Sequence, residues 1–178
     1  MRRGTDIRPV FAGKRILLTG SDTQLGAGIS EKLKDAGAAV VATRAIADDA
    51  WDAQFMDVSS FDAVLKAVAF HDPDAIVHCT HIVPDECSIY AAVSLIVQGT
   101  KNIVDMGKPL VIASDYISVE QGGDVDVCMT VAERMASDAG APIVVPMTGC
   151  LPSERAAMVV DRLEEVLKSG RSGAERGS

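Results

Sequence analysis

The sequence predicts an α/β domain in which a parallel sheet is covered by helices on both faces. Three observations predict it: short apolar runs typical of buried strands, amphipathic stretches typical of helices, and short connections between them along the whole chain. The chain has 178 residues, of which 48% are hydrophobic, so it can bury one sizeable core. We therefore expect a single domain over 1–170 and a polar, disordered tail over 171–178.

Strands and helices alternate in the expected order of elements. We expect strands at Arg15–Thr19, Ala38–Ala42, Ala53–Asp57, Ala75–Cys79, Leu110–Ala113 and Ile143–Val145. We expect helices at Leu25–Ala36, Ser60–Phe70, Ser88–Asp105, Val125–Ala139 and Ser153–Lys168. The first helix has Leu25, Ile29 and Leu33 one turn apart, and Ser59 or Ser60 is suited to cap the second.

Composition argues against several classes of partner. The net charge of −8 disfavours binding to nucleic acid and to anionic membrane surfaces. Aromatic residues make up only 4% of the chain, too few for a platform on which bases stack. No apolar run reaches the length of a membrane span, and no apolar signal region follows the basic start. We expect a soluble, cytoplasmic protein.

A glycine-rich turn, residues 19–26, joins the first strand to the first helix. Gly20 suits a tight turn and Gly26 suits close helix packing, while the start of the helix offers N–H groups to a pyrophosphate. The middle glycine of the dinucleotide pattern is replaced, because Thr23 and Gln24 occupy both candidate positions. A dinucleotide would lie against Gly20, Ser21, Thr23, Gln24, Leu25 and Gly26. The alternative is a strand–helix turn that binds nothing.

Arg44 follows the second strand, where a dinucleotide would place its adenosine ribose. An acidic residue at this point usually binds the 2′-hydroxyl of NAD, whereas an arginine suits the 2′-phosphate of NADP. Arg44 therefore favours NADP over NAD if a dinucleotide binds. The alternative is a solvated surface arginine.

Six short motifs follow one another between residues 14 and 152. They are Lys14-Arg15-Ile16-Leu17-Leu18-Thr19-Gly20, Asp57-Val58, Asp74-Ala75-Ile76-Val77-His78-Cys79-Thr80-His81, Gly99-Thr100-Lys101-Asn102-Ile103, Val111-Ile112-Ala113-Ser114-Asp115-Tyr116 and Ala132-Glu133-Arg134. Their order resembles the extended short-chain dehydrogenase/reductase family, which includes NAD(P)-dependent epimerases and dTDP-4-dehydrorhamnose reductases. The resemblance implies a Rossmann-like, doubly wound, three-layer αβα fold and a bound NAD(P).

The resemblance also assigns roles to residues at the strand ends. It implies that Asp57 and Val58 contact adenine and that Cys79 and Thr80 lie beside the cofactor. Ser114 matches the family's catalytic serine or threonine.

The departures from the family concern its catalytic pair. Counting back from Glu133, the positions of the family's Tyr and Lys fall on Val125 and Met129. Valine cannot transfer the proton that a phenol gives to a carbonyl, and methionine cannot lower the pKa of a phenol. His81 also replaces a small residue beside the cofactor, and family members continue into a substrate-binding lobe. The chain therefore resembles a degenerate, truncated member.

Three functions remain open. The chain could bind NAD(P) as a sensor or as a partner subunit of an active enzyme. It could be an active oxidoreductase or epimerase that uses Ser114, Tyr116 and His81 in place of the lost pair. It could also be an interaction module that keeps the fold without the ligand. We expect no metal site, because His78 and His81 would point to different faces of a strand.

Two expected helices, 88–105 and 125–139, are apolar over much of their circumference. A helix that covers one face of a sheet needs a single apolar stripe. The resembling family dimerises through the equivalent helices, so we expect a homodimer or a hetero-oligomer formed through these two. The alternative is deep burial inside one chain.

Overall fold

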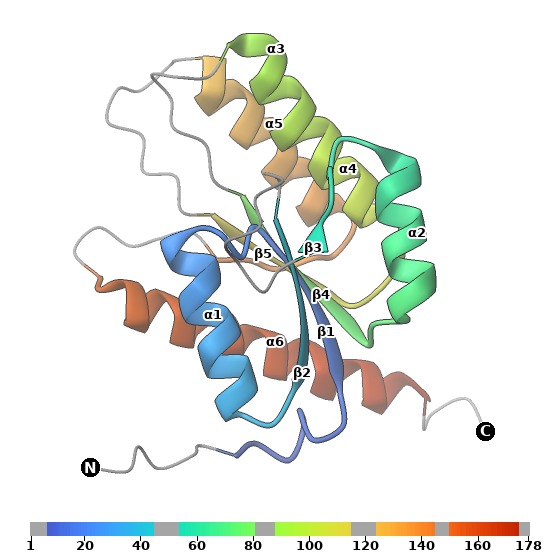
Figure 1. Ribbon diagram of the computed structural model, residues 1–178, viewed down its shortest axis with the longest axis vertical. Coiled ribbons are helices and arrows are strands. Elements are labelled where there is room, and N and C mark those ends of the chain that lie inside the picture. Colours follow the sequence, from blue (N-terminus) through green and yellow to red (C-terminus); the bar gives the residue numbers. More distant parts are fainter. Residues whose placement is uncertain (1–6, 45–53, 81–87, 115–123, 145–149, 175–178) are drawn as a thin grey trace.

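A computed structural model of the chain describes residues 7–44, 54–80, 88–114, 124–144 and 150–174 (Figure 1). Its strands are β1 (Arg15–Thr19), β2 (Ala39–Arg44), β3 (Gln54–Phe55), β4 (Ala75–Thr80), β5 (Leu110–Ser114) and β6 (Ile143–Val144). Its helices are α1 (Gln24–Asp35), α2 (Phe61–His71), α3 (Ile89–Ala92), the π-helical segment η2 (Val93–Gln98), α4 (Gly99–Val104), α5 (Asp124–Asp138) and α6 (Pro152–Ala174).

The six strands form one parallel sheet in the order β3-β2-β1-β4-β5-β6. The chain starts at β1, winds outward to β3, and then returns to β4 on the other side of β1. This is the strand order of a Rossmann-like, doubly wound fold, so the predicted fold class is confirmed. The order reverses between β1 and β4, and ligands of such sheets bind in the crevice beyond the carboxyl ends of the strands at that point.

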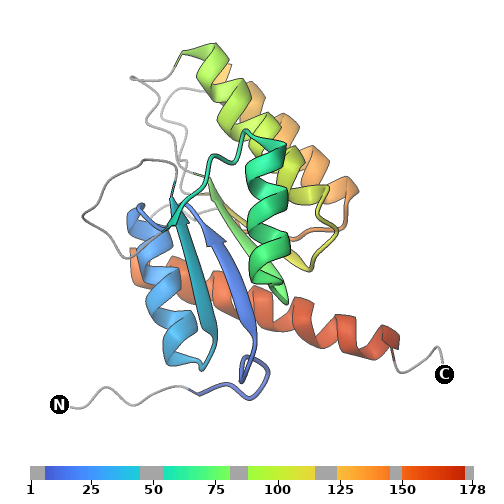
Figure 2. The same cartoon turned by 45° about the vertical axis from the view of Figure 1, so that its right-hand side comes forward.

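Helices cover both faces of the sheet, which gives the three predicted layers (Figure 2). Successive residues of a strand point to opposite faces, and β1 shows this clearly. Ile16 and Leu18 pack in the core beneath α1 and α6, whereas Leu17 packs in the core beneath α2 and α4. The buried strands therefore supply both cores at once.

The element boundaries differ from the expected ones in two instructive places. The expected helix 88–105 is continuous through α3, η2 and α4, but its middle is π-helical, with the N–H of Gly99 bonded to the carbonyl of Ser94. Helix α6 extends to Ala174, so 171–174 are helical although we expected the tail to begin there. Adding a turn to an existing helix is easy because only its first turn is costly to form. No helix in the described ranges is both long and apolar enough to cross a membrane.

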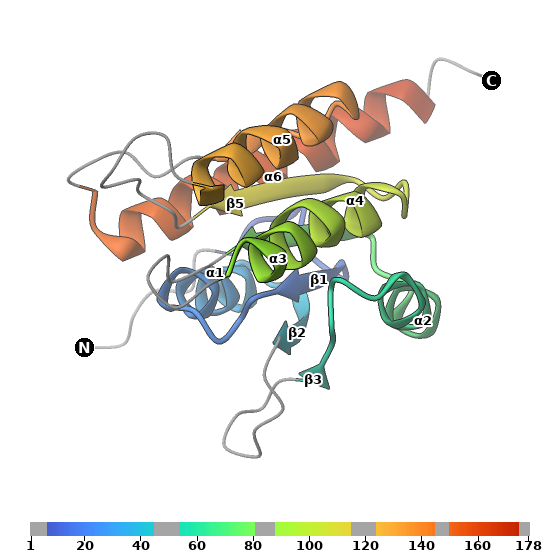
Figure 3. The same cartoon turned by 90° about the horizontal axis from the view of Figure 1, so that it is seen from above.

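The two apolar helices pack lengthwise against each other (Figure 3). Their contact is a small core of its own, made by Ala92, Ile96, Cys128, Met129 and Ala132. Other apolar side chains of the same helices remain exposed: Ile89, Tyr90, Val93, Val127 and Val131. Burial within the chain therefore accounts for only part of their apolar surface.

Candidate functional site

The β1–α1 turn has two positions at which only glycine fits. Gly20 has a φ of +66°, and a Cβ there would lie 2.4 Å from the carbonyl oxygen of Cys79. A Cβ on Gly26 would lie 2.1 Å from the carbonyl oxygen of Gly20. Both neighbours are backbone atoms that cannot move aside alone. The roles predicted for these glycines, a tight turn and a close approach, are the ones that the geometry requires.

Thr23, in the place of the missing glycine, is the N-cap of α1. Its Oγ1 accepts the N–H of Gly26 at 2.9 Å and donates to the carbonyl of Gly20 at 2.9 Å. Its hydroxyl is thus engaged inside the turn. Gln24 and Leu25 are the first two residues of α1. Their N–H groups make no hydrogen bond within the described part of the chain. These two donors can bind an anion, and the helix dipole favours one there.

Ser21 ties this turn to the end of β2. Its backbone N–H and its Oγ both donate to the carbonyl of Thr43, each at 3.0 Å. The side chain of Ser21 is buried and already hydrogen-bonded, so it serves the turn itself. This link holds the start of α1 beside Arg44, the last residue of β2.

Arg44 is buried, with only 6% of its surface exposed. Its Nε and Nη1 have no hydrogen-bond partner within the described residues. The alternative of a solvated surface arginine is therefore wrong. Burying guanidinium nitrogens without hydrogen-bond partners is costly, because they have lost their water without gaining another acceptor. Arg44 is therefore prepared to pair with an anion that approaches the end of β2.

The segment after β3 carries the two residues expected at adenine. Oδ1 of Asp57 accepts hydrogen bonds from the N–H and the Oγ of Ser59, at 2.9 and 2.7 Å. Val58 is buried against Gly99. A Cβ added to Gly99 would lie only 2.9 Å from Cγ2 of Val58. No hydrogen bond within the described residues uses the second oxygen of the Asp57 carboxylate. The segment is joined to the end of β2 by the Met56 N–H, which donates to the Arg44 carbonyl at 2.9 Å.

Cys79, near the end of β4, and Ser114, at the end of β5, are buried. Cys79 faces the core beneath α1, with its Sγ 3.7 Å from Thr23 Oγ1, so its side chain lies under the glycine turn. Ser114 is also buried, and it pairs in register with Thr80. His81 and Tyr116, the other two substitute catalytic residues, lie outside the described residues, so their placement stays a prediction.

A buried pair that the sequence did not reveal lies beside the turn. Thr19 Oγ1 accepts the N–H of Cys79 at 3.3 Å and lies 2.7 Å from Nδ1 of His78. His78 Nε2 is buried and has no hydrogen-bond partner within the described residues, so Thr19 is the polar contact of this ring. Burial lowers the pKa of His78 to about 4.

This lowered pKa predicts an acid-sensitive fold. The imidazole has a pKa of about 6.5 in the unfolded chain, which therefore binds a proton that the folded chain excludes between the two values. The free energy of unfolding should be highest above about pH 6.5 and should fall by about 3 kcal/mol as the pH drops to about 4. Urea unfolding across that range measures it. His78→Gln should remove most of the pH dependence, whereas His71→Gln, at a partly exposed site, should keep it; equal slopes for wild type and His78→Gln would contradict this assignment.

The position expected for the family's lysine is occupied by an apolar contact. Met129 is buried between α5 and the helix formed by η2, among Ile96, Cys128 and Ala132. An ammonium group would be unfavourable in that environment. The side chain of Val125 lies outside the described residues.

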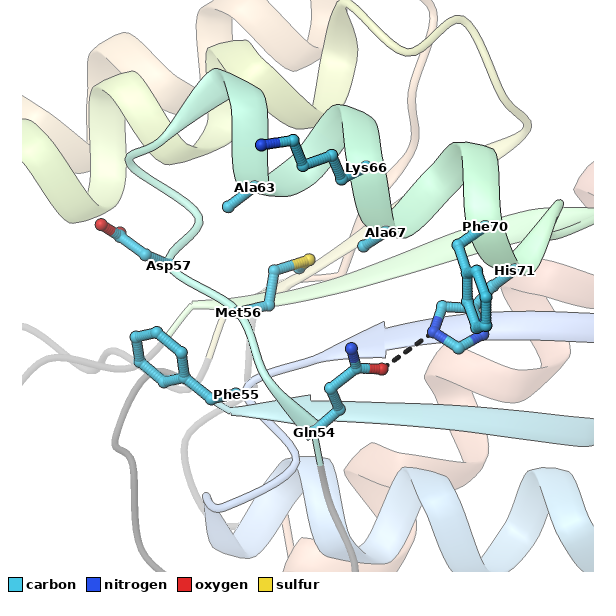
Figure 4. Close-up of a pocket in the computed structure, with 9 residues that line it drawn as sticks. All are labelled: Gln54, Phe55, Met56, Asp57, Ala63, Lys66, Ala67, Phe70 and His71. Atoms are coloured by element: carbon cyan, nitrogen blue, oxygen red, sulfur yellow. Dashed lines mark hydrogen bonds between the residues drawn. The ribbon is translucent and has the colours of Figure 1, made fainter.

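The described residues also form a groove of about 420 Å³ between β3 and α2 (Figure 4). Phe55, Met56 and Phe70 give it apolar walls, and a hydrogen bond of 2.9 Å joins Gln54 to His71 at one end. It lies beside the edge strand and away from the reversal of strand order between β1 and β4. In the described part of the chain, no three metal-ligating side chains gather at one place.

Solved structures share this fold at low sequence identity. WbmH of Bordetella bronchiseptica, solved with NAD⁺, matches 85% of this chain and 72% of its own at a TM-score of 0.63 and 16% identity. A dTDP-4-dehydrorhamnose reductase of Clostridium acetobutylicum matches 85% and 71% at a TM-score of 0.67 and 18% identity. The UDP-glucose 4-epimerase of Thermus thermophilus, solved with NAD, matches 74% and 53% at a TM-score of 0.57 and 17% identity. No protein-family model and no curated sequence matches the chain.

Proposed function

We propose that this chain binds a nicotinamide dinucleotide across the strand ends between β1 and β4, with NADP preferred over NAD. The observation that carries the proposal is Arg44, a buried guanidinium with two unpaired nitrogens at the end of β2. A 2′-phosphate is an anion of the right kind for it, because its oxygens can accept two parallel hydrogen bonds from one guanidinium. The similar enzymes solved with NAD support the choice of a dinucleotide.

The other parts of the site fit the same ligand. The unpaired N–H groups of Gln24 and Leu25 suit the diphosphate. The outer oxygen of Asp57 and the N–H of Val58 offer an acceptor and a donor to the amino group and N1 of adenine. When bound, such a cofactor supplies a hydride acceptor or donor, and the chain's own residues bind and orient it.

We propose further that the protein acts as a redox-state sensor or as a partner subunit, without the family's Tyr–Lys chemistry. The apolar burial of Met129 supports this, since no ammonium occupies that position. The competing proposal is an enzyme that uses Ser114, Tyr116 and His81. The third is an interaction module that binds no dinucleotide.

These three proposals are distinguished by titrating the purified protein with NADPH and with NADH while nicotinamide fluorescence is monitored. We expect saturable binding with NADPH the tighter ligand, and no consumption of NADPH in the presence of a panel of aldehydes, ketones and 4-keto sugar nucleotides. Turnover by the wild type that is lost in Tyr116→Phe would contradict the sensor proposal and support the proposal of an active enzyme. Failure to bind either dinucleotide would leave the interaction module.

We also propose that the exposed apolar face of α3, η2 and α5 joins two copies of this chain, or this chain and a related one. Tyr90 is 83% exposed and Val127 is 59% exposed, on neighbouring helices that already pack together. An exposed apolar surface of this kind is typical of a protein interface.

Val127→Glu should therefore convert the oligomer to a monomer, because a carboxylate would lose its water in the interface. Sedimentation equilibrium measures the mass. Leu151→Glu, also exposed but at the start of α6, is the matched control and should leave the mass unchanged. A wild-type protein that stays monomeric at high concentration would refute the proposed interface.

A further inference from the structure

Asn102 makes a fully satisfied hydrogen-bond network that links α4 to the segment after β3. It is almost completely buried. Its Nδ2 donates to the carbonyls of Val58 and Ser59, at 2.9 and 3.0 Å. Its Oδ1 accepts from Nε2 of Gln98 at 2.7 Å. Both hydrogens of the amide are therefore used on a segment more than forty residues away in the sequence.

These bonds hold the Val58–Ser59 backbone in one orientation. With both carbonyls turned toward Asn102, the segment also bonds to itself through Asp57 and Ser59. Gly99 lets Val58 pack directly against the helix from the same side. The segment is thus fixed by helix residues, although it has no regular secondary structure.

We propose that Asn102, oriented by Gln98, is a positioning residue that lets Asp57 and Val58 distinguish adenine from hypoxanthine. This inference rests on the proposed dinucleotide site. Adenine presents a donor at its amino group and an acceptor at N1, which complement the Asp57 carboxylate and the Val58 N–H. Hypoxanthine presents an acceptor and a donor at the same two places, so both contacts become unfavourable.

Gln98 and the two backbone carbonyls together fix the orientation of the Asn102 amide. The two ends of an asparagine amide have nearly the same shape, and the partner of each end determines its orientation. Gln98→Glu replaces the donor at Asn102 Oδ1 by an acceptor. The Asn102 oxygen then loses its donor and faces a negative charge, which loosens the hold of the amide on the two carbonyls. Gln98 is exposed, so the change should leave the core intact.

The test compares the Kd of NADPH with that of its reduced hypoxanthine analogue, for wild type and for Gln98→Glu. We expect the wild type to bind NADPH at least about tenfold more tightly than the analogue, and the variant to reduce this preference to about threefold or less. Ser94→Asp adds the same charge one turn earlier on an exposed position and should keep the wild-type preference. A purely structural role for Asn102 would weaken both ligands alike.

The outcomes separate the inference from the function on which it rests. A wild type that binds NADPH and its analogue equally, or a Gln98→Glu variant that keeps the preference, would overturn the positioning role and leave the cofactor site standing. Loss of the preference in Ser94→Asp would also overturn it, because charge alone would then explain the effect. A wild type that binds neither dinucleotide would overturn the proposed function and this inference together.

Discussion

Gly26→Ala is expected to abolish NADPH binding and to lower the free energy of unfolding by about 3 kcal/mol. The added Cβ would lie 2.1 Å from the Gly20 carbonyl oxygen and 2.9 Å from both the Gly20 carbonyl carbon and Ser21 Cα. Because all three are backbone atoms, the turn and the start of α1 must move apart. That movement displaces the N–H groups that we assign to the diphosphate. Urea unfolding and fluorescence titration measure the two effects.

Gly28→Ala is the matched control on the same helix. Its Cβ would meet only the Ala156 Cβ, at 3.3 Å, a contact that a small shift of α6 can relieve. Alanine also has a higher helix propensity than glycine by about 1 kcal/mol, which offsets the tighter contact. We expect this variant to bind NADPH and to unfold much like the wild type. A Gly26→Ala protein with the same properties would show that the turn is not the tight structure described above.

Arg44→Met should make the protein without ligand more stable, by about 1–3 kcal/mol, while it greatly weakens NADPH binding. The substitution removes a buried charge, two of whose nitrogens lack a partner within the described residues, and keeps much of the side chain's volume. Binding sites often carry such a conflict, in which a group that destabilises the empty site is needed for the ligand. Urea unfolding without ligand measures the first effect.

Arg134→Met, at an exposed ion pair with Asp138, is the control for loss of an arginine, and should change the stability by less than about 1 kcal/mol. If Arg44→Met instead destabilises the protein by several kcal/mol, Arg44 has a structural partner and does not await an anion.

The fold could be predicted from the sequence because its signals are local. Apolar runs such as Arg15–Thr19 and caps such as Ser60 are visible without any tertiary contact, and the structure has both. The π-helical segment at Val93–Gln98 was not predictable, because a single extra residue in a turn barely changes the periodicity of a helix. The π segment becomes apparent only in the backbone hydrogen bonds of Gly99.

The sequence indicated which candidate residues follow the strands, but not how their side chains are hydrogen-bonded. The sequence placed Thr23 in the phosphate turn, and left open whether its side chain would crowd or bind a ligand. In the structure Thr23 caps its own helix, a role that its place directly before a predicted helix could have indicated. The burial of Arg44 excluded the alternative of a solvated surface arginine. Burial depends on tertiary contacts, which the local sequence does not show. Asn102 had no signal for its role, because both carbonyls that it binds lie in a distant segment.

The central claim is that Arg44 gives this site a preference for a 2′-phosphate, and four dissociation constants test it. They are the Kd values of NADPH and NADH for wild type and for Arg44→Met, measured at one ionic strength, since salt screens such contacts. We predict that the wild type binds NADPH at least about tenfold more tightly than NADH, as a charge-assisted bidentate contact would give. Arg44→Met should weaken NADPH alone until the two affinities are equal. Equal affinities in the wild type, or an equal loss for both ligands in the variant, would contradict the claim.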